Sequence, residues 1–353
     1  MQSLLPYLKL AFERQGSDLF FTPGAPPMLK IEGEMHAVGR TVMTGAMLAD
    51  ISAELLTPDQ LARFSAEREL DCALEAGEFG RFRLNLFFQR NQVAFVLRHV
   101  KARVPRLDEL NVPEVLKSLV MHKRGLVLVV GASGSGKSTT LAAMLNHRNE
   151  EASGHILTIE DPIEFVHPNL RSIVNQREVG QDALSYERAL VGAMREAPDV
   201  ILIGEVRTRE TMDSCVQLAN TGHLALSSLH ANNAPQALQR IVNLYPQDRR
   251  DQLYLDLSLT LRAIVSQRLV RRRDGRRCAA VEVLVNTPLI QDLIVSRRID
   301  EVRTAMEQSS SPGMQTFDQS LYRLYKQGLI ELDEALDNAD SRTNLEAKIN
   351  FGG

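Results

Sequence analysis

The chain has 353 residues, of which 44% are hydrophobic and 24% are charged. It can therefore bury cores of ordinary size, and its length suggests two or three domains. Forty-one Lys and Arg stand against 44 Asp and Glu, a formal net charge of -3, which argues against a protein that mainly coats nucleic acid. The three cysteines, Cys72, Cys215 and Cys278, are far apart, which excludes a Cys-rich zinc site or a disulfide scaffold.

The sequence contains no apolar run near the roughly 20 residues of a membrane-spanning helix. The opening segment 1–18 carries charges within a helical pattern, unlike a secretory signal. We therefore expect a cytoplasmic protein with reduced thiols.

The first hundred residues predict a small α+β domain. Segment 3–15 spaces its apolar residues like a short amphipathic helix, and strand-like runs follow within 18–38. A helical stretch is predicted near 45–68. Segments 80–90 and 93–100 alternate apolar and polar residues, which predicts a hairpin of two strands.

The rest of the chain predicts an α/β domain. Residues 101–112 mix charge with proline and predict a linker, and a helix is expected at 113–122. Apolar runs of the kind buried in a parallel sheet then alternate with helical segments, at 125–131, 155–160, 199–206 and 224–229. This alternation predicts a covered parallel sheet over about 125–280, followed by a mostly helical tail.

A phosphate-binding loop is predicted at 131–138. The pattern G-x-x-x-x-G-K-S follows one of these strands directly and precedes a helix, which is the context that a P-loop requires. Lys137 would reach the β- and γ-phosphates of ATP, Ser138 would ligate Mg²⁺, and Thr139 would lie near the α-phosphate. The predicted nucleotide-binding residues of the loop are Gly131, Ser133, Gly134, Ser135, Gly136, Lys137, Ser138 and Thr139.

Acidic residues follow two of the later strands. Glu205 ends the run VILIGE, where a carboxylate associated with Mg²⁺ is expected. In T-I-E-D-P-I-E, residues 158–164, we expect Glu160 and Asp161 to shape the loop and contact Mg²⁺ through water. Glu164 would serve as the base for the attacking water. Acids that merely end a strand or face solvent are the alternative interpretation.

Two histidines flank the run 224–229. His223 and His230 are seven residues apart, so an extended strand would turn them to opposite faces, and they are not expected to chelate one metal together. From this local pattern a structural role is the leading interpretation. In the N-terminal hairpin, Arg83 and Arg98 are candidate arginine fingers, or else solvated arginines.

A second predicted hairpin surrounds Asp274-Gly275, a good tight-turn dipeptide. Its tip, residues 271–277, is densely positive. It is either solvated or docked to an acidic partner or an anionic membrane surface, and the sequence leaves these alternatives open.

The segments GASGSGKST, TIEDPIEF, NQREVG, APDVILIGEVR, TGHLALSSLHANNA and GMQTFDQSL occur in this order. Together they resemble the secretion-type ATPases that power type IV pili, and most closely the PilT- and PilU-type retraction ATPases, with PilU-type chains nearest. The resemblance implies a PAS-like domain at 1–100, a linker at 101–112, a RecA-like ATPase domain at 113–285 and a helical region at 286–353. It also implies a homohexameric ring.

The same resemblance implies roles for individual residues. Glu164 would be the catalytic glutamate, and Glu205 the Walker B glutamate. His223 and His230 would form the His box of this family beside the nucleotide. Arg83 and Arg98 would reach the γ-phosphate of the nucleotide. The implied partners are a PilT-like retraction ATPase and an inner-membrane platform protein, which would hold the protein at that membrane, and no specific nucleic acid.

The sequence therefore predicts an ATP-hydrolysing motor of pilus retraction and twitching motility that works with a PilT-like motor. Segment 288–298, PLIQDLIVSRR, departs from the A-I-R-N-L-I-R-E-like helix of PilT-type motors. This favours the alternative of a nucleotide-dependent accessory module whose own hydrolysis does not suffice for retraction. A translocase acting on DNA is disfavoured by the net charge.

Overall fold

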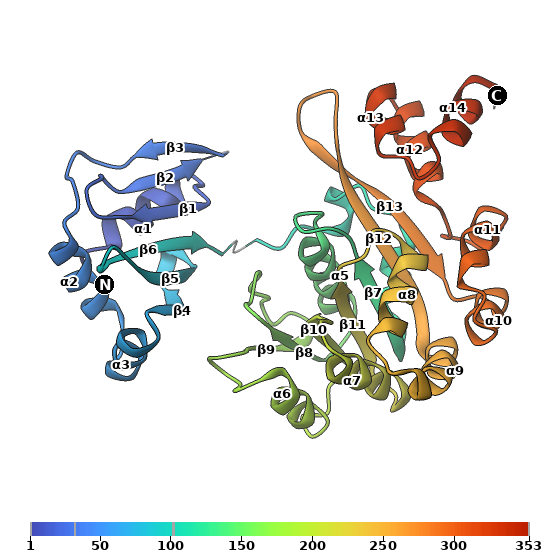
Figure 1. Cartoon of the computed structure of the whole chain (residues 1–353), viewed down its shortest axis with the longest axis horizontal. Helices are drawn as coiled ribbons and strands as arrows, with labels where there is room; N and C mark the ends of the chain where they lie inside the picture. The colour runs from blue at the N-terminus through green and yellow to red at the C-terminus, as the bar shows by residue number, and fades with distance from the viewer. Residues whose placement is uncertain (1, 32, 101–102, 352–353) are drawn as a thin grey trace. The chain divides into compact units, whose positions relative to one another are not determined.

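The computed structural model describes residues 2–31, 33–100 and 103–351, which form two compact units (Figure 1). The first unit runs to Arg103 and includes Glu164–Val166. The second unit consists of Val104–Ile163 and the chain from His167 onward. No helix among the described residues is long and apolar enough to cross a membrane.

The first unit is a six-stranded antiparallel sheet, in the order β3-β2-β1-β6-β5-β4, with three helices. Its strands are β1 (Asp18–Phe21), β2 (Met28–Ile31), β3 (Glu34–Ala37), β4 (Glu69–Glu75), β5 (Arg81–Gln89) and β6 (Gln92–His99). Its helices are α1 (Leu5–Glu13), α2 (Gly45–Leu55) and α3 (Pro58–Glu67), and the 3-10 turn η1 (Gly77–Phe79) precedes β5. Leu8, Leu48 and Phe64 from the helices share a core with the strands. The α+β prediction for this region and the hairpin at 80–100 are confirmed.

The helical stretch predicted at 45–68 is two helices. Thr57 lies between them. Its side chain accepts a hydrogen bond from the backbone N–H of Gln60, and the Gln60 side chain accepts one from the backbone N–H of Thr57. Pro58 occupies the first position of α3. A proline there disfavours a helical conformation at the residue before it, so α2 has to end first.

The second unit is built on a seven-stranded sheet in the order β13-β12-β7-β11-β10-β8-β9, parallel except for β13. Its strands are β7 (Gly125–Val130), β8 (Gly154–Glu160), β9 (Ser172–Glu178), β10 (Val200–Glu205), β11 (Leu224–Leu229), β12 (Leu261–Arg271) and β13 (Arg277–Val285). The predicted parallel sheet and the hairpin around Asp274-Gly275 are confirmed. Strand β9 was not predicted, because its sequence SIVNQRE is mostly polar.

The helices of this unit cover both faces of the sheet. They are α4 (Val115–Val120), α5 (Lys137–Glu151), α6 (Tyr186–Ala193), α7 (Arg209–Asn220), α8 (Ala234–Asn243), α9 (Arg250–Thr260), α10 (Pro288–Val295), α11 (Val302–Glu307), α12 (Phe317–Lys326), α13 (Leu332–Asp337) and α14 (Arg342–Phe351), with 3-10 turns η2 (Leu107–Glu109), η3 (Gln247–Arg249) and η4 (Ile299–Glu301). Strand β7 supplies both cores. Val127 and Val129 pack with α4 and α5, whereas Leu126 and Leu128 pack with α6 to α10. Burial on both faces explains why this strand is continuously apolar.

The ends of the second unit differ from the predicted boundaries. Of the predicted linker, residues 101–102 lie outside the described residues, and Leu107 is buried in the core formed with α4 and α5. The packed part of the unit therefore begins before residue 113. Helices α12 to α14 form a separate small core with Val270 and Cys278 from the β12–β13 hairpin, so the helical tail is attached to the sheet.

Candidate active site

The P-loop connects β7 to α5 at the carboxyl edge of the parallel sheet. Gly134 has φ +75° and Gly136 has φ +91°, in the left-handed region that favours glycine. A Cβ at Gly136 would lie 2.7 Å from the Gln267 Nε2 atom. Helix α5 begins at Lys137, so its first free N–H groups face the loop. Backbone N–H groups and the positive helix end together favour a bound phosphate here.

The Lys137 ammonium lies inside this loop. Its Nζ atom donates to the carbonyl oxygens of Gly131 at 3.0 Å and Ala132 at 2.9 Å, and lies 3.4 Å from Nδ1 of His230. The residue is buried. The side chain is therefore fixed where its charge acts on an anion held by the loop, in a setting that screens it less than water does.

His230 and Glu205 extend this contact along the sheet edge. The Glu205 carboxylate lies 3.0 Å from His230 Nε2 and 2.9 Å from the Arg207 guanidinium. Because an ammonium only donates, His230 Nδ1 accepts from Lys137 and Nε2 carries the proton toward Glu205. The bond to Glu205 also raises the pKa of Arg207. Lys137, His230, Glu205 and Arg207 thus form one continuous polar chain.

The order of the strands produces this chain. Strand β11 lies between β7 and β10, and His230 directly follows β11, so its ring lies between the P-loop and Glu205. Glu205 was predicted here from its position at the end of β10. The ring of His230 joins Lys137 to Glu205, and its catalytic role stays a prediction.

His223 is not brought into this site within its own chain. It precedes β11, whereas His230 follows it, so a six-residue strand of roughly 20 Å separates them. Its Nδ1 atom lies 3.2 Å from the Thr221 hydroxyl and 3.3 Å from the carbonyl oxygen of Leu218. Within a single chain His223 therefore lies away from the P-loop, and its contact with the nucleotide stays a prediction.

A second acidic cluster lies beyond Glu205 at the end of β8. Glu160 accepts hydrogen bonds from the Thr158 hydroxyl at 2.7 Å and from the Gln176 amide at 3.3 Å. Burial raises the pKa of the Tyr186 phenol, and the nearby charges of Asp161 and Glu160 raise it further. The phenol consequently keeps its proton and can donate to these carboxylates or to water. Sequence reasoning missed Tyr186, since no motif marks it.

The other predicted catalytic residues belong to the first unit. Arg83 and Arg98 are direct partners across β5 and β6, so their side chains leave the same face of that sheet. The Arg98 guanidinium lies 2.7 Å from Asp18, and that of Arg83 lies 3.8 Å from Asp71. Each guanidinium therefore faces an acid of its own sheet, on β1 for Arg98 and on β4 for Arg83. Glu164 is exposed and belongs to this unit as well. Its role as a base, and the arginines' roles as fingers, stay predictions.

Gln267 on β12 supports the P-loop from behind and was also missed. Its Oε1 atom accepts a 2.7 Å hydrogen bond from the hydroxyl of Thr140, in the first turn of α5. Its backbone oxygen lies 2.5 Å from the position of a Cβ at Gly131. The residue is buried and touches the loop near both of its ends.

The positive hairpin tip is partly neutralised within the chain. Asp274 lies 2.7 Å from the Arg276 guanidinium and 3.1 Å from that of Arg272, and Glu331 lies 3.1 Å from Arg273. Each pair has at least one exposed or half-exposed partner. The local acids reduce the charge available for an outside partner.

The protein side chains fit Mg²⁺ only together with nucleotide. Among the described residues, no group of three His, Cys, Asp or Glu side chains could hold a metal ion. The Ser138 hydroxyl at the start of α5 supplies one oxygen ligand of the kind that Mg²⁺ uses with phosphates. Both Glu205 oxygens already bind His230 and Arg207, so Glu205 would act on the metal through water.

The chain has relatives that match it over nearly its whole length. The PilU type IV pilus ATPase of Pseudomonas aeruginosa is 49% identical over 98% of this chain and 91% of its own. The PilT type IV pilus retraction ATPase of the same organism is 39% identical, covering 95% of this chain and 98% of its own.

A solved structure is consistent with the sequence similarity to PilT and PilU. The pilus retraction motor PilT with bound ADP superposes with a TM-score of 0.91 at 38% identity, over 97% of this chain and 98% of that one. The resemblance to PilT- and PilU-type ATPases is confirmed. The model of the Type II/IV secretion system protein family matches residues 68–337, and the chain therefore belongs to that family.

Proposed function

We propose that this protein hydrolyses ATP as a motor ATPase of type IV pilus retraction. The observation that carries the proposal is the continuous chain from Lys137 on the P-loop through His230 to Glu205. It joins a phosphate-binding loop to the carboxylate that a P-loop ATPase needs at its metal and water. The assignment to type IV pili comes from the names of the relatives that match nearly the whole chain.

In the proposed reaction, the loop N–H groups and Lys137 bind the β- and γ-phosphates, and Ser138 contributes to Mg²⁺ binding. The metal supplies charge neutralisation on the phosphates. Glu164 accepts a proton from the attacking water, whose oxygen bonds to the γ-phosphorus as the bond to ADP breaks. Glu205 orients water at the metal, while Glu160, Asp161 and Tyr186 hold the adjoining loop.

The remaining predictions extend the proposal to the assembly. The first unit would be a PAS-like domain, and Arg83 with Arg98 would bind the γ-phosphate, so that hydrolysis moves one domain against the other. The protein would work as a homohexamer at the inner membrane, on a pilus platform protein and beside a PilT-like motor. A contribution of His223 would require a second copy of the chain.

The alternative is an accessory ATPase whose hydrolysis does not suffice for retraction. Helix α10, PLIQDLIV, favours it, because Leu289 and Val295 are exposed there and the sequence departs from that of the PilT-type helix. Pilus retraction in four strains separates the two candidates: each motor deleted alone, both deleted, and Lys137→Ala. Retraction that persists on this protein alone would exclude the accessory role.

ATP turnover by the purified full-length protein tests the enzymatic part. Lys137→Ala should abolish binding of ATP, and Glu205→Gln should lower kcat by roughly 10²-fold or more while nucleotide still binds. Glu164→Gln should do the same if Glu164 is the base. Full turnover by Glu164→Gln would remove that assignment, and full turnover by Glu205→Gln would contradict the proposed site.

A further inference from the structure

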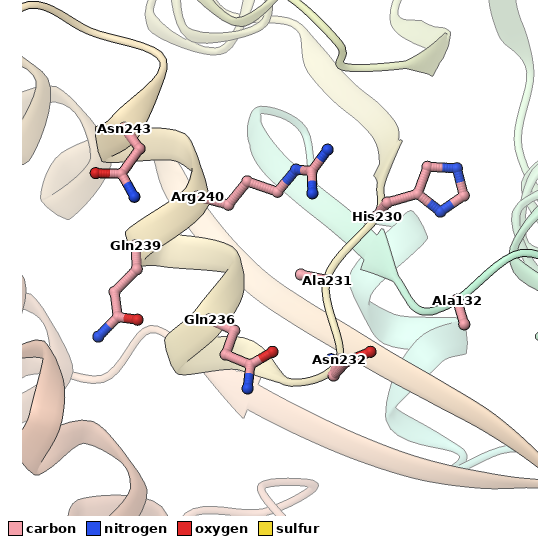
Figure 2. Close-up of a pocket in the computed structure, with 8 residues that line it drawn as sticks. All are labelled: Ala132, His230, Ala231, Asn232, Gln236, Gln239, Arg240 and Asn243. Atoms are coloured by element: carbon pink, nitrogen blue, oxygen red, sulfur yellow. The ribbon is translucent and has the colours of Figure 1, made fainter.

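A cavity of about 420 Å³ adjoins the P-loop on the side of α8 (Figure 2). Ala132, the second residue of the P-loop, forms part of its wall. The other polar lining residues come from the segment after β11 and from α8, and they are His230, Asn232, Gln236, Gln239, Arg240 and Asn243. The cavity therefore shares His230 with the chain of contacts from Lys137 to Glu205, whereas its other polar side chains take no part in that chain.

The lining favours an anion. It contains one guanidinium, one imidazole and four side-chain amides, and no carboxylate. Arg240 makes no hydrogen bond or ion pair with any residue that the structure describes. Figure 2 shows its side chain leaving α8 toward the segment that carries His230 and Ala231. A guanidinium without an acidic partner in such a cavity is suited to bind phosphate oxygens in pairs.

The backbone of helix α8 is anchored to the core, whereas the Arg240 side chain itself is exposed. Leu238 and Ile241 on the same helix are buried in the main core. At its N-terminus the Asn233 side chain accepts from the N–H of Gln236, and the buried Glu282 carboxylate accepts from the N–H of Ala234 at 2.7 Å. A ligand on a helix anchored at both its end and its face is better positioned than one on a loop.

The cavity adjoins the position expected for the γ-phosphate. His230 contacts Lys137, which is the residue expected at the γ-phosphate, and Ala132 belongs to the same loop. A phosphoryl group held by Lys137 therefore has the cavity beside it. Arg240 would offer that group a second cation once the bond to ADP is broken and the Lys137 contact weakens.

We propose that this cavity is a phosphate site with Arg240 as its principal ligand. It takes a phosphate group either as the terminal phosphoryl of bound ATP or as inorganic phosphate after hydrolysis. The inference rests on the proposed ATPase function and adds to it the group through which the phosphate is retained.

The test uses the full-length protein and the variants Arg240→Gln and Arg240→Lys. Arg249→Gln is the matched control, because Arg249 is exposed in η3 and does not line the cavity. Three affinities are measured by calorimetry with Mg²⁺: ADP, a non-hydrolysable ATP analogue, and inorganic phosphate added to the ADP complex. Inhibition of ATP turnover by inorganic phosphate is measured in parallel.

We expect Arg240→Gln to leave ADP affinity unchanged and to weaken phosphate binding at least ten-fold, with partial recovery in Arg240→Lys. A loss for inorganic phosphate identifies the released product as the ligand, and a loss for the ATP analogue alone identifies the terminal phosphoryl. If Arg240→Gln binds both like the Arg249→Gln control, the inference is wrong. Wild-type protein that binds phosphate at this site without hydrolysing ATP would contradict the proposed function and leave the inference standing.

Discussion

The central residues of the site are linked through hydrogen bonds rather than merely close together. Lys137 only donates, the Glu205 carboxylate only accepts, and His230 between them can do both. The imidazole therefore contacts both Lys137 and Glu205. Gln267 lies behind the loop, where its Oε1 atom accepts from Thr140 and its Nε2 atom lies 2.7 Å from the position that a Cβ at Gly136 would take.

We predict that Thr140 and Gln267 are energetically coupled. Thr140→Val leaves the buried Oε1 atom of Gln267 without its donor, which should cost about 1 to 3 kcal/mol of unfolding free energy. Gln267→Met should cost a similar amount and weaken ADP binding, because the P-loop loses its support. The double variant should lose less than the sum of the single losses.

Denaturant unfolding and ADP titration of the three variants measure this coupling. Thr221→Val is the control, since the Thr221 hydroxyl is bonded within its own helix end, to Gln217 and Leu218, and near His223. Strictly additive losses would show that the Thr140–Gln267 bond does not support the loop.

Among the elements, the β12–β13 hairpin connects the P-loop side of the sheet to the C-terminal helices. Arg268 follows Gln267 on β12 and donates to Asp340 at 2.5 Å and to the carbonyl oxygen of Asn338 at 2.6 Å. Its guanidinium also lies 3.9 Å from the ring of Phe317. The segment between α13 and α14 is therefore tied to the strand beside the nucleotide site.

We predict that Asp340→Asn loosens helices α12 to α14 without abolishing nucleotide binding. Asp340 is largely buried between Arg268 and Arg303, and removal of its charge leaves two arginines without their shared acid. Hydrogen exchange in these helices should rise by roughly ten-fold or more, which corresponds to about 1.4 kcal/mol. Asp337→Asn is the control, because its pair with Arg342 is exposed on both sides and contributes little. Equal exchange in both variants would contradict the prediction.

For the whole molecule, two buried groups set opposing pH dependences of stability. Burial raises the pKa of Glu282 to about 7 and lowers that of His167 to about 4. The Glu282 carboxyl, with its raised pKa, stabilises the fold at low pH, and this stabilisation is lost as the pH rises from about 4.5 to 7. The His167 imidazole, with its lowered pKa, stabilises the fold fully above about pH 6.5, and this stabilisation is lost as the pH falls toward 4.

Because the two windows overlap, these contributions nearly cancel between about pH 4.5 and 6.5. Glu282→Gln keeps the acceptor for Ala234 and Ser266 but removes the ionisation. The variant should gain stability over the parent as pH rises, by about 3 kcal/mol between pH 5 and 8. Urea unfolding followed by tyrosine fluorescence measures it, since five of the six tyrosines lie in the second unit. If the difference in unfolding free energy between Glu282→Gln and the parent does not grow with pH, Glu282 is ionised in the folded protein.

Much of the fold could be predicted from local patterns. The buried strands are continuous apolar runs in the sequence. The P-loop glycines occupy positions where the backbone adopts left-handed angles. The predictions failed where neighbouring residues override periodicity. The single helix near 45–68 is interrupted by Thr57 and Pro58, and β9 is too polar to be recognised alone.

The sequence by itself determined the P-loop, the acid at the end of β10 and the family resemblance, because each depends on residues close together in the chain. Only the tertiary structure decided that His230 joins Lys137 to Glu205 while His223 lies at the other end of β11. It also brought Tyr186, Gln267 and Arg240 to the site. The reason is the strand order: β11 is inserted between β7 and β10, and that arrangement depends on packing between segments nearly a hundred residues apart.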